Sequence, residues 1–216
     1  MGRIEINNKA EWLKVRAVQG IGGSETACII GKNPYKSNLT LWQEKTGKIK
    51  PEDISEKPAV KYGKEAEKHI RALFALDYPE YSIEYHEFDI LFNDDYPFIF
   101  CTLDGELTDT NGRKGVLEIK TTGIQRSSQW AEWDNRVPDS YFVQILHQLI
   151  ATGYDFAVLT VQIKYHKDGE LRKIIRSYKW ERSELIDDME YLTKKEVEFW
   201  QQIQENKTPA LILPEI

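Results

Sequence analysis

The feature that most constrains the fold is a pair of short apolar segments, each joined to charged residues that a buried strand normally excludes. Residues 98–103 (FIFCTL) are followed at once by Asp104, and the apolar segment VLEIK contains Glu118 and Lys120. Side chains alternate between the two faces of a strand, so Glu118 and Lys120 share one face. If the two strands are neighbours in a sheet, Asp104 at the end of one lies close to Glu118 on the other.

These charged residues have the types that one particular chemistry requires. Two carboxylates a few ångströms apart repel each other strongly unless a divalent cation lies between them. A lysine on the same face can stabilise negative charge on a phosphate. Asp104, Glu118 and Lys120 therefore suit metal-assisted hydrolysis of a phosphodiester. A solvated strand face would give the same Glu-x-Lys spacing, which recurs at Glu205 and Lys207.

Glu67 adds a third acid, on a helix predicted over residues 59–76. It falls at the edge of the apolar stripe of this helix. The stripe consists of Gly63, Ala66, Ile70, Leu73 and Phe74. An acid on a packing face needs a partner, because an unpaired buried charge is costly. That partner is either a basic side chain or a metal ion with its bound water.

A helix predicted over residues 140–151 carries Tyr141, Gln144 and Gln148 on one face. Gln144 can hold a substrate phosphate or orient water, and it can equally cap a neighbouring strand. The sequence leaves both roles open.

A glycine turn, GIGGS, follows Arg16 and a helix predicted over residues 9–19. Ser24 is expected to cap the next helix, over residues 25–30. Backbone N–H groups at such a helix start suit a phosphate. The turn fits neither a Walker A loop nor a dinucleotide fingerprint, because the glycine spacing and the preceding strand are missing. Alone, it predicts only a capped helix.

The order of the predicted elements indicates an α/β or α+β fold with a central mixed β-sheet flanked by helices. Strands are expected over residues 82–92, 98–103, 116–120, 155–165 and 171–180, with further helices over residues 40–46 and 183–204. The last two strands flank an Asp-Gly pair, which is typical of a hairpin. We expect one domain over residues 1–216, with a helical part at 1–76, a sheet core at 82–180 and a C-terminal helix at 183–204.

Composition excludes several classes of protein. The 216 residues are 41 % apolar and 30 % charged, which is typical of a globular chain. The sequence contains no run of 18 apolar residues, so no membrane span is expected. The first residues lack the apolar region of a secretory signal. The net charge of −6 argues against broad, non-specific coating of nucleic acid. Cys28 and Cys101 lie in apolar runs and are expected to be reduced core thiols of a cytosolic protein.

Taken in order, the segments resemble the phage-type exonucleases of the PD-(D/E)XK nuclease superfamily. In particular they are similar to the YqaJ-like viral recombinase exonucleases, to which lambda exonuclease is related. The resemblance covers residues 12–153. The matching segments are WLKVRAVQGIGGSETACIIGKNPY, YGKEAEKHIRALF, CTLDGEL, VLEIKTT and YFVQILHQLIATGY.

This resemblance implies a role for several residues. The implied metal ligands are Asp104, Glu118 and the Ile119 carbonyl, with Glu67 serving a second metal. Lys120 would be the catalytic lysine and Gln144 the supporting glutamine. A pocket for a 5′-phosphate would consist of Arg16, Ser24, Thr102 and Arg126. The sequence departs from the family at two positions: Leu103 stands where the superfamily name implies proline, and Leu146 stands where a second glutamine is frequent. His147 or Gln148 is then the substitute for that glutamine.

The resemblance also implies a function. It is that of a Mg²⁺-dependent 5′-to-3′ exonuclease with two ions, for which Mn²⁺ can substitute. The enzyme would digest one strand of linear duplex DNA and leave 3′ single-stranded tails for a single-strand-annealing partner in phage-type recombination. A homotrimer, a phage or prophage origin and the bacterial cytoplasm go with this interpretation. The alternatives are another PD-(D/E)XK endonuclease, restriction-like or structure-specific, and an inactive protein that binds DNA ends.

Overall fold

The computed structural model describes residues 1–213, apart from the side chains of Ala17 and Val18. The expected α/β fold with mixed sheet is confirmed, but the strands form two sheets rather than one. One sheet has four strands in the order β1-β4-β5-β2, and the other has five in the order β3-β6-β7-β8-β9. The strands are β1 Gly2–Ile4, β2 Ile21–Gly22, β3 Ser82–Glu84, β4 Ile90–Phe92, β5 Ile99–Cys101, β6 Gly105–Thr108, β7 Lys114–Ile124, β8 Phe156–Lys167 and β9 Glu170–Glu181. The α-helices are α1 Lys9–Gln19, α2 Gly23–Ile29, α3 Asn38–Lys45, α4 Pro58–Asp77, α5 Asp139–Thr152 and α6 Ile186–Gln204, and the 3₁₀ helices are η1 Ser127–Trp133 and η2 Arg182–Glu184.

Strand β7 is the centre of the five-stranded sheet. It pairs antiparallel with β6 and parallel with β8. Strands β8 and β9 form the predicted hairpin, whose two turn residues, Asp168 and Gly169, have φ values of 55° and 81°. Positive φ at both positions is typical of the tight turn that suits twisted strands.

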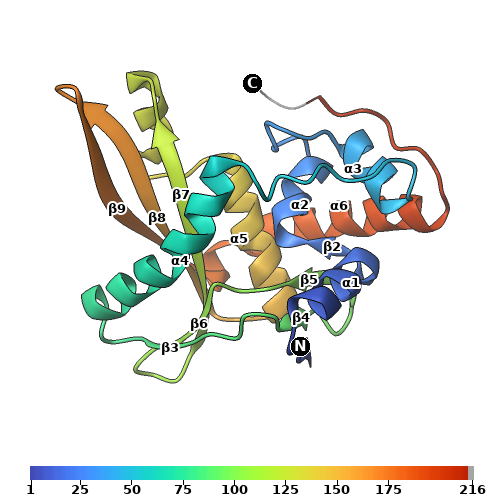
Figure 1. Cartoon of the computed structure of the whole chain (residues 1–216). Coiled ribbons are helices and arrows are strands. Elements are labelled where there is room, and N and C mark those ends of the chain that lie inside the picture. The colour runs from blue at the N-terminus through green and yellow to red at the C-terminus, as the bar shows by residue number, and fades with distance from the viewer. Residues whose placement is uncertain (214–216) are drawn as a thin grey trace.

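Helices cover both faces of this sheet (Figure 1). Ala66, Ile70 and Phe74 of α4 pack on one face, against a cluster that includes Leu117 and Phe156. Leu73, which was expected on the same stripe, is instead 45 % exposed.

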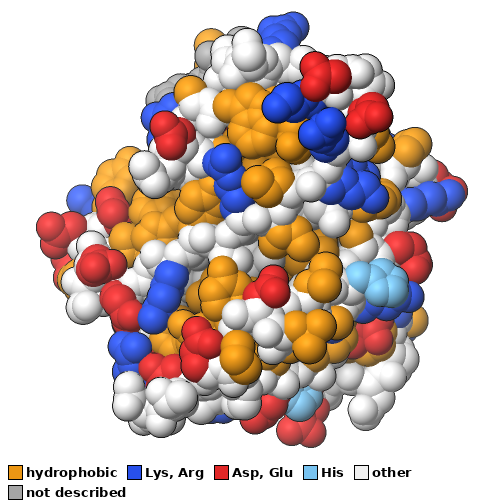
Figure 2. Space-filling model, turned by 90° about the vertical axis from the view of Figure 1, so that its left-hand side faces the viewer, with side chains coloured by type: hydrophobic (Ala, Val, Ile, Leu, Met, Phe, Trp, Pro, Cys, Tyr) orange, Lys and Arg blue, Asp and Glu red, His pale blue; other side chains and the backbone are white. Residues whose placement is uncertain are grey.

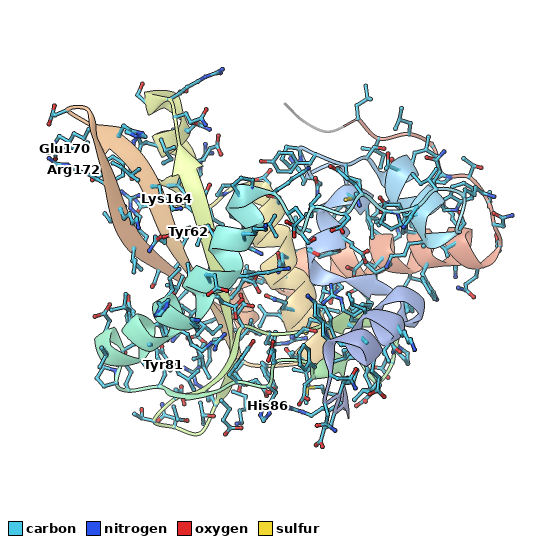
Figure 3. All side chains as sticks on the ribbon, in the orientation of Figure 1. Tyr62, Tyr81, His86, Lys164, Glu170 and Arg172 are labelled. Carbon is cyan, nitrogen blue, oxygen red and sulfur yellow. The ribbon has the colours of Figure 1, made fainter. Side chains whose placement is uncertain are left out.

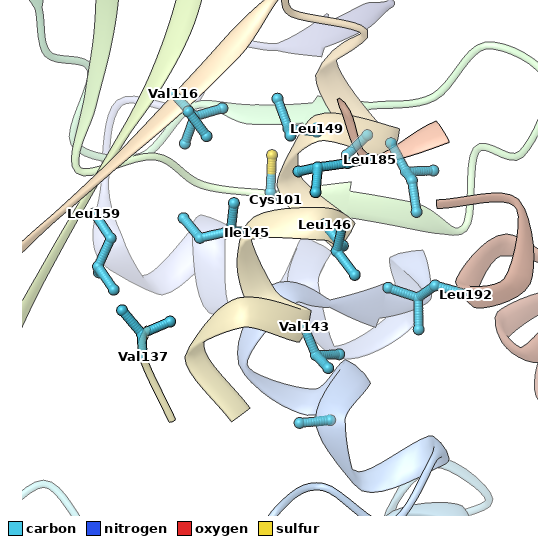
Figure 4. Close-up of a cluster of buried hydrophobic side chains, with 14 of the residues drawn as sticks. Cys101, Val116, Val137, Val143, Ile145, Leu146, Leu149, Leu159, Leu185 and Leu192 are labelled. Atoms are coloured by element: carbon cyan, nitrogen blue, oxygen red, sulfur yellow. The ribbon is translucent and has the colours of Figure 1, made fainter. Parts of the chain in front are cut away.

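Helix α5 packs on the other face and also contacts β5 of the four-stranded sheet. It lies between the two sheets and α6, so most of its residues are buried. Figure 4 shows its apolar side chains packed among Cys101, Val116, Leu159 and Leu192. The helix that carries the two glutamines therefore packs against both sheets and against other helices.

Residues 82–92 do not form the single strand that we expected. They contribute β3 to the five-stranded sheet and β4 to the four-stranded sheet. The apolar alternation explains the break, because Tyr85 and Phe88 are three residues apart and not two. Continued as one strand, the second half would point its apolar residues to the wrong face.

Two helices begin at residues other than those expected. Helix α3 begins at Asn38 because the Ser37 hydroxyl accepts a bond from the N–H of Thr40 at 3.1 Å. Helix α6 begins at Ile186, after a 3₁₀ turn takes up residues that were predicted to belong to it. Both cysteines are buried free thiols, as expected. In the part of the chain that the structure describes, no helix is long and apolar enough to cross a membrane.

Candidate active site

Asp104 lies immediately before β6, at an edge of β7 that β6 leaves open. Pairing with β6 reaches only as far along β7 as Leu117, which is opposite Gly105. The next outward-facing N–H, that of Ile119, donates to Asp104 Oδ2 at 2.7 Å. The strand before Asp104 is not a neighbour of VLEIK, since β5 belongs to the other sheet. Asp104 nevertheless reaches the strand of Glu118, because the chain passes directly into β6.

The Ile119 carbonyl faces the same open edge. The N–H and C=O groups of one strand residue point in the same direction. Because the N–H of Ile119 points to Asp104, its carbonyl oxygen points to that side as well. This oxygen therefore points to the side of Asp104, where the family resemblance implies an additional metal ligand.

Glu118 is buried and accepts bonds from three side chains. Lys120 Nζ lies 2.7 Å from Glu118 Oε1, and Gln144 Nε2 donates to the same oxygen at 2.7 Å. Gln148 Nε2 donates to Oε2 at 2.5 Å. Gln144 and Gln148 are four residues apart and so share one face of α5. Of the two substitutes that the sequence left open, Gln148 is the one that contacts the carboxylate.

His147 faces away from Glu118 into a buried cluster. Its Nδ1 lies 2.6 Å from Glu196 Oε1 of α6, and its Nε2 lies 2.7 Å from the Phe100 carbonyl. Thr26 of α2 donates to the same Glu196 oxygen. His147 and Glu196 are both fully buried. This pair could not be predicted from the sequence, because Glu196 is one of many charged residues of the last helix.

Gly23 lets α2 approach α5 at the residues of the site. A Cβ at Gly23 would lie 3.3 Å from Gln144 Cγ, 3.5 Å from His147 Cδ2 and 3.7 Å from Gln148 Cγ. The glycine turn thus has a packing role that its backbone N–H groups did not suggest.

Glu67 has the basic partner that was one of its two expected alternatives. Arg71 lies one turn further along α4 and donates to the Glu67 carboxylate. Arg71 also donates to the Asp104 carbonyl at 2.6 Å, and its guanidinium lies 3.4 Å from the centre of the Tyr85 ring. The i, i+4 spacing of Glu67 and Arg71 in the sequence is the feature from which this contact could have been predicted.

The three acids crowd one another. Burial, followed by repulsion from Glu118 and Glu67, raises the pKa of Asp104 well above its ordinary value. Burial also raises the pKa of Glu67, with Glu118 adding to the effect. Burial opposes the charge on Lys120, but attraction to Glu118 and Asp104 outweighs it and raises the pKa of Lys120. The site therefore combines excess negative charge with a protonated lysine.

The ligand types fit a hard divalent cation, although the side chains are bonded to one another. No three or more acidic, His or Cys side chains among residues 1–213 are arranged ready to hold a metal. Glu67 is bonded to Arg71, and Glu118 to amides and Lys120. Carboxylates and a backbone carbonyl are the oxygen donors that Mg²⁺ takes, and a cation would relieve the repulsion at Asp104. Binding would require Glu67 to leave Arg71.

Arg16 and Thr102 come together beside Trp12. The Arg16 guanidinium lies 4.4 Å from the centre of the Trp12 ring and 5.7 Å from that of Phe100. Trp12 Nε1 donates to Thr102 Oγ1 at 3.1 Å, which leaves the Thr102 hydroxyl hydrogen free to donate. Burial lowers the pKa of Arg16, yet an arginine stays charged in proteins. A partly buried cation and a hydroxyl donor thus lie close together.

Ser24 and Arg126 differ in their placement: Gly22, two residues before Ser24, lies beside the Arg16 guanidinium, whereas Arg126 lies beyond the end of β7. Ser24 is exposed inside the first turn of α2 and does not cap it, because Gly22 is the N-cap and its N–H donates to Glu25 at 2.9 Å. Arg126 is exposed beyond the end of β7, at the start of η1. Six residues of extended chain separate it from Lys120, about 20 Å. The structure brings Arg16 and Thr102 together on Trp12 and separates Arg126 from Lys120 along β7 and the residues that follow it.

The arrangement of sheets and helices matches that of known nucleases. An alkaline exonuclease from Laribacter hongkongensis is similar over 92 % of this chain and 96 % of its own, with a TM-score of 0.62 at 16 % identity. The structure of that exonuclease in complex with dAMP matches over the same shares, with a TM-score of 0.58 at 17 % identity. The chain thus has the PD-(D/E)XK fold of an alkaline exonuclease.

Sequence comparison assigns the family. The model of the YqaJ-like viral recombinase domain matches residues 11–155. An uncharacterized protein of Bacillus subtilis (strain 168), YqaJ, is 30 % identical over 208 residues, which cover 94 % of this chain and 59 % of that protein. The chain belongs to the YqaJ-like viral recombinase domain family, as the motifs predicted. It spans about three-fifths of the length of this curated relative.

Proposed function

We propose that this chain is a Mg²⁺-dependent exonuclease that digests one strand of linear duplex DNA from its 5′ end. The observation that carries the proposal is the geometry around Glu118: Lys120, Gln144 and Gln148 all contact it beside Asp104, at the open edge of β7. Family membership supplies the class of reaction, and these contacts supply the groups that it needs.

The chemistry divides between metal and protein. When bound, divalent cations would supply an activated water and neutralise charge on the phosphate. Their ligands would be Asp104, Glu118, the Ile119 carbonyl and, for a second ion, Glu67. Lys120 is protonated and so stabilises negative charge on the phosphate instead of removing a proton. Gln144 and Gln148 fix the orientation of the Glu118 carboxylate.

Digestion from a 5′ end would depend on a terminal phosphate. Arg16 and Thr102 offer a cation and a hydroxyl donor close together, and a guanidinium can make paired bonds to phosphate. We include Ser24 and Arg126 in this pocket on the family resemblance. A terminal phosphate carries more charge than an internal diester, so the pocket would prefer it and would draw the strand forward after each cut.

The setting of the activity is also proposed from the family resemblance. We propose that residues 1–216 are one nuclease domain and that three chains form a ring around duplex DNA. The 3′ single strands would pass to a single-strand-annealing protein in recombination of phage or prophage DNA, in the bacterial cytoplasm. Mn²⁺ would be able to support the reaction in place of Mg²⁺.

Digestion of end-labelled linear duplex beside covalently closed circular DNA tests the proposal, with Mg²⁺ and with chelator. We expect loss of the 5′-end strand of the linear DNA with Mg²⁺, an intact circle, and no reaction with chelator. Cutting of the circle would identify an endonuclease instead. Binding of DNA ends with no cutting under any metal would identify an inactive end-binding protein.

A further inference from the structure

The part of the five-stranded sheet beyond α4 carries a basic surface. The face that packs on α4 contributes Leu117, Ile119, Phe156 and Val158 to the core. Further along the strands, the same face consists of Thr121, Gly123, Gln162, Lys164, His166, Leu171, Lys173, Ile175 and Ser177. It contains two lysines and a histidine but no acid, in a chain whose net charge is −6.

Lys164 and Lys173 lie directly opposite each other in the β8–β9 ladder. Like charges in directly opposite positions destabilise a sheet. Both ammonium groups lie over the Tyr62 ring, with Nζ 2.8 Å from its centre for Lys164 and 5.5 Å for Lys173. Tyr62 is held in place by a bond from its hydroxyl to Gln162. Within residues 1–213, neither lysine forms an ion pair with an acid, so no acidic side chain there competes with an anionic ligand for them.

Several charged residues of α4 and β9 form ion pairs with one another. The ion pairs nearby are Glu56 with Lys61, Glu65 with Lys68, Glu181 with Lys179, and Glu170 with Arg172. Figure 3 shows Lys164 beside Tyr62 next to α4, whereas Glu170 and Arg172 lie at the hairpin tip. In Figure 2, which faces this side of the molecule, Lys and Arg side chains gather with apolar ones over the upper part, and a few acidic side chains lie among and beside them. The surface therefore suits a polyanion such as a nucleic acid, whose phosphates can pair with the two lysines.

We propose that Lys164, Lys173 and Tyr62 bind the sugar–phosphate backbone of the DNA whose cleavage is proposed above, on which this inference rests. Lys164 is four residues along β8 from Thr160, the residue paired with Ile119. Four residues of strand span about 13 Å. Along the axis of a duplex, that distance corresponds to about four base pairs at about 3.4 Å each. A duplex with one bond at the carboxylates therefore reaches the lysines within its first helical turn.

Salt-dependent binding of a linear duplex tests this surface. The assay uses Ca²⁺ in place of Mg²⁺ to prevent cleavage and compares the unmodified chain with Lys164→Gln/Lys173→Gln. Each phosphate contact contributes about 0.9 to the slope of log affinity against log salt. We expect the double variant to lose about 1.8 from this slope, which corresponds to about 60-fold in affinity over the decade from 1 M to 0.1 M salt.

Two further variants make the test specific. Arg172→Gln removes a cation from the same hairpin, on the opposite sheet face and already paired with Glu170, and should leave the slope unchanged. Lys164→Arg/Lys173→Arg keeps the charge and should restore the slope, which separates lost contact from lost folding. If the unmodified chain binds and cuts DNA and Lys164→Gln/Lys173→Gln keeps its slope, this inference is wrong and the proposed function stands. If the double variant changes only the mass of the oligomer, the surface joins copies of the chain and the inference is again wrong. If the unmodified chain does not bind DNA at all, the proposed function fails with it.

Discussion

At the scale of the residue, Glu118 shows how the protein keeps an acid in its interior. Two amides and a lysine contact its carboxylate, so its oxygens have partners where burial removes water. Asp104 has fewer compensating contacts, and burial together with repulsion from Glu118 and Glu67 raises its pKa. Without a bound cation, the electrostatic repulsion among the three acids therefore acts mainly on Asp104.

Asp104→Asn should make the metal-free protein more stable. Asparagine can keep the bond from the Ile119 N–H through its carbonyl oxygen, while the repelling charge disappears. A gain of about 1 kcal/mol raises the melting temperature by about 2–4 °C in a chain of this size. Thermal unfolding with and without Mg²⁺ measures the effect: Mg²⁺ should stabilise the unmodified chain and not the variant. An equal response to Mg²⁺ in both proteins would remove Asp104 from the ligand set.

Arg16→Ala should reduce the preference for 5′-phosphorylated ends over 5′-hydroxyl ends. The loss of a charged hydrogen bond corresponds to about 1–3 kcal/mol of that preference. Initial rates on the two kinds of linear duplex measure it, and Arg126→Ala in the same assay shows whether that more distant guanidinium contributes. Equal rates on both ends in the unmodified protein would show that no 5′-phosphate pocket operates.

At the scale of the element, α5 positions the two glutamines that contact Glu118, because other elements pack against this helix. Glu196 of α6 and the Phe100 carbonyl of β5 bind His147, which lies between Gln144 and Gln148 in the sequence. Burial alone would lower the pKa of His147, but attraction and hydrogen bonding to Glu196 outweigh it and raise the pKa. The orientation of Gln144 and Gln148 thus depends on a buried ion pair outside the site.

This pair should make stability depend on pH. The pKa of His147 in the folded chain lies above its ordinary value of about 6.5. Its contribution is therefore complete below about pH 6.5 and is lost as the pH rises through the higher, folded pKa. Urea unfolding between pH 6 and 9 should show the unmodified chain losing its advantage over His147→Asn as the pH rises. A constant difference across this range would contradict a charged His147.

The elements differ in how far the sequence predicted them. Regular patterns gave α1, α4, α5 and the β8–β9 hairpin, because periodicity and turn residues are local properties. The division of residues 82–92 between two sheets was not predicted, since which strand pairs with which depends on distant segments. In the site, strand alternation predicted that Glu118 and Lys120 share a face, and the two side chains are in contact. Glu196 and the packing role of Gly23 were missed, because only the folded chain brings them to His147.

At the scale of the whole molecule, an acidic chain that holds DNA needs either local basic surfaces or enclosure of the duplex. The net charge is −6, and most cations outside the proposed DNA surfaces are paired with acids. Lys164 and Lys173 supply a local surface, and a ring of three chains would supply the enclosure. The two devices are independent of each other.

Light scattering should give a mass about three times the 25.2 kDa of the chain. Digestion by such a ring should be processive, because a closed ring does not leave the duplex between cuts. A monomer at working concentration, with distributive digestion, would contradict the ring and leave the catalytic site unaffected.

The most direct test of the catalytic site measures cleavage and binding together for Glu118→Ala. Cleavage of 5′-phosphorylated linear duplex is followed in Mg²⁺, and binding of the same duplex in Ca²⁺. The geometry predicts that cleavage is abolished and that DNA binding largely survives, because the residues proposed to bind the backbone and the terminal phosphate lie outside the carboxylate cluster. Full cleavage by Glu118→Ala would show that the chemistry takes place elsewhere in the protein.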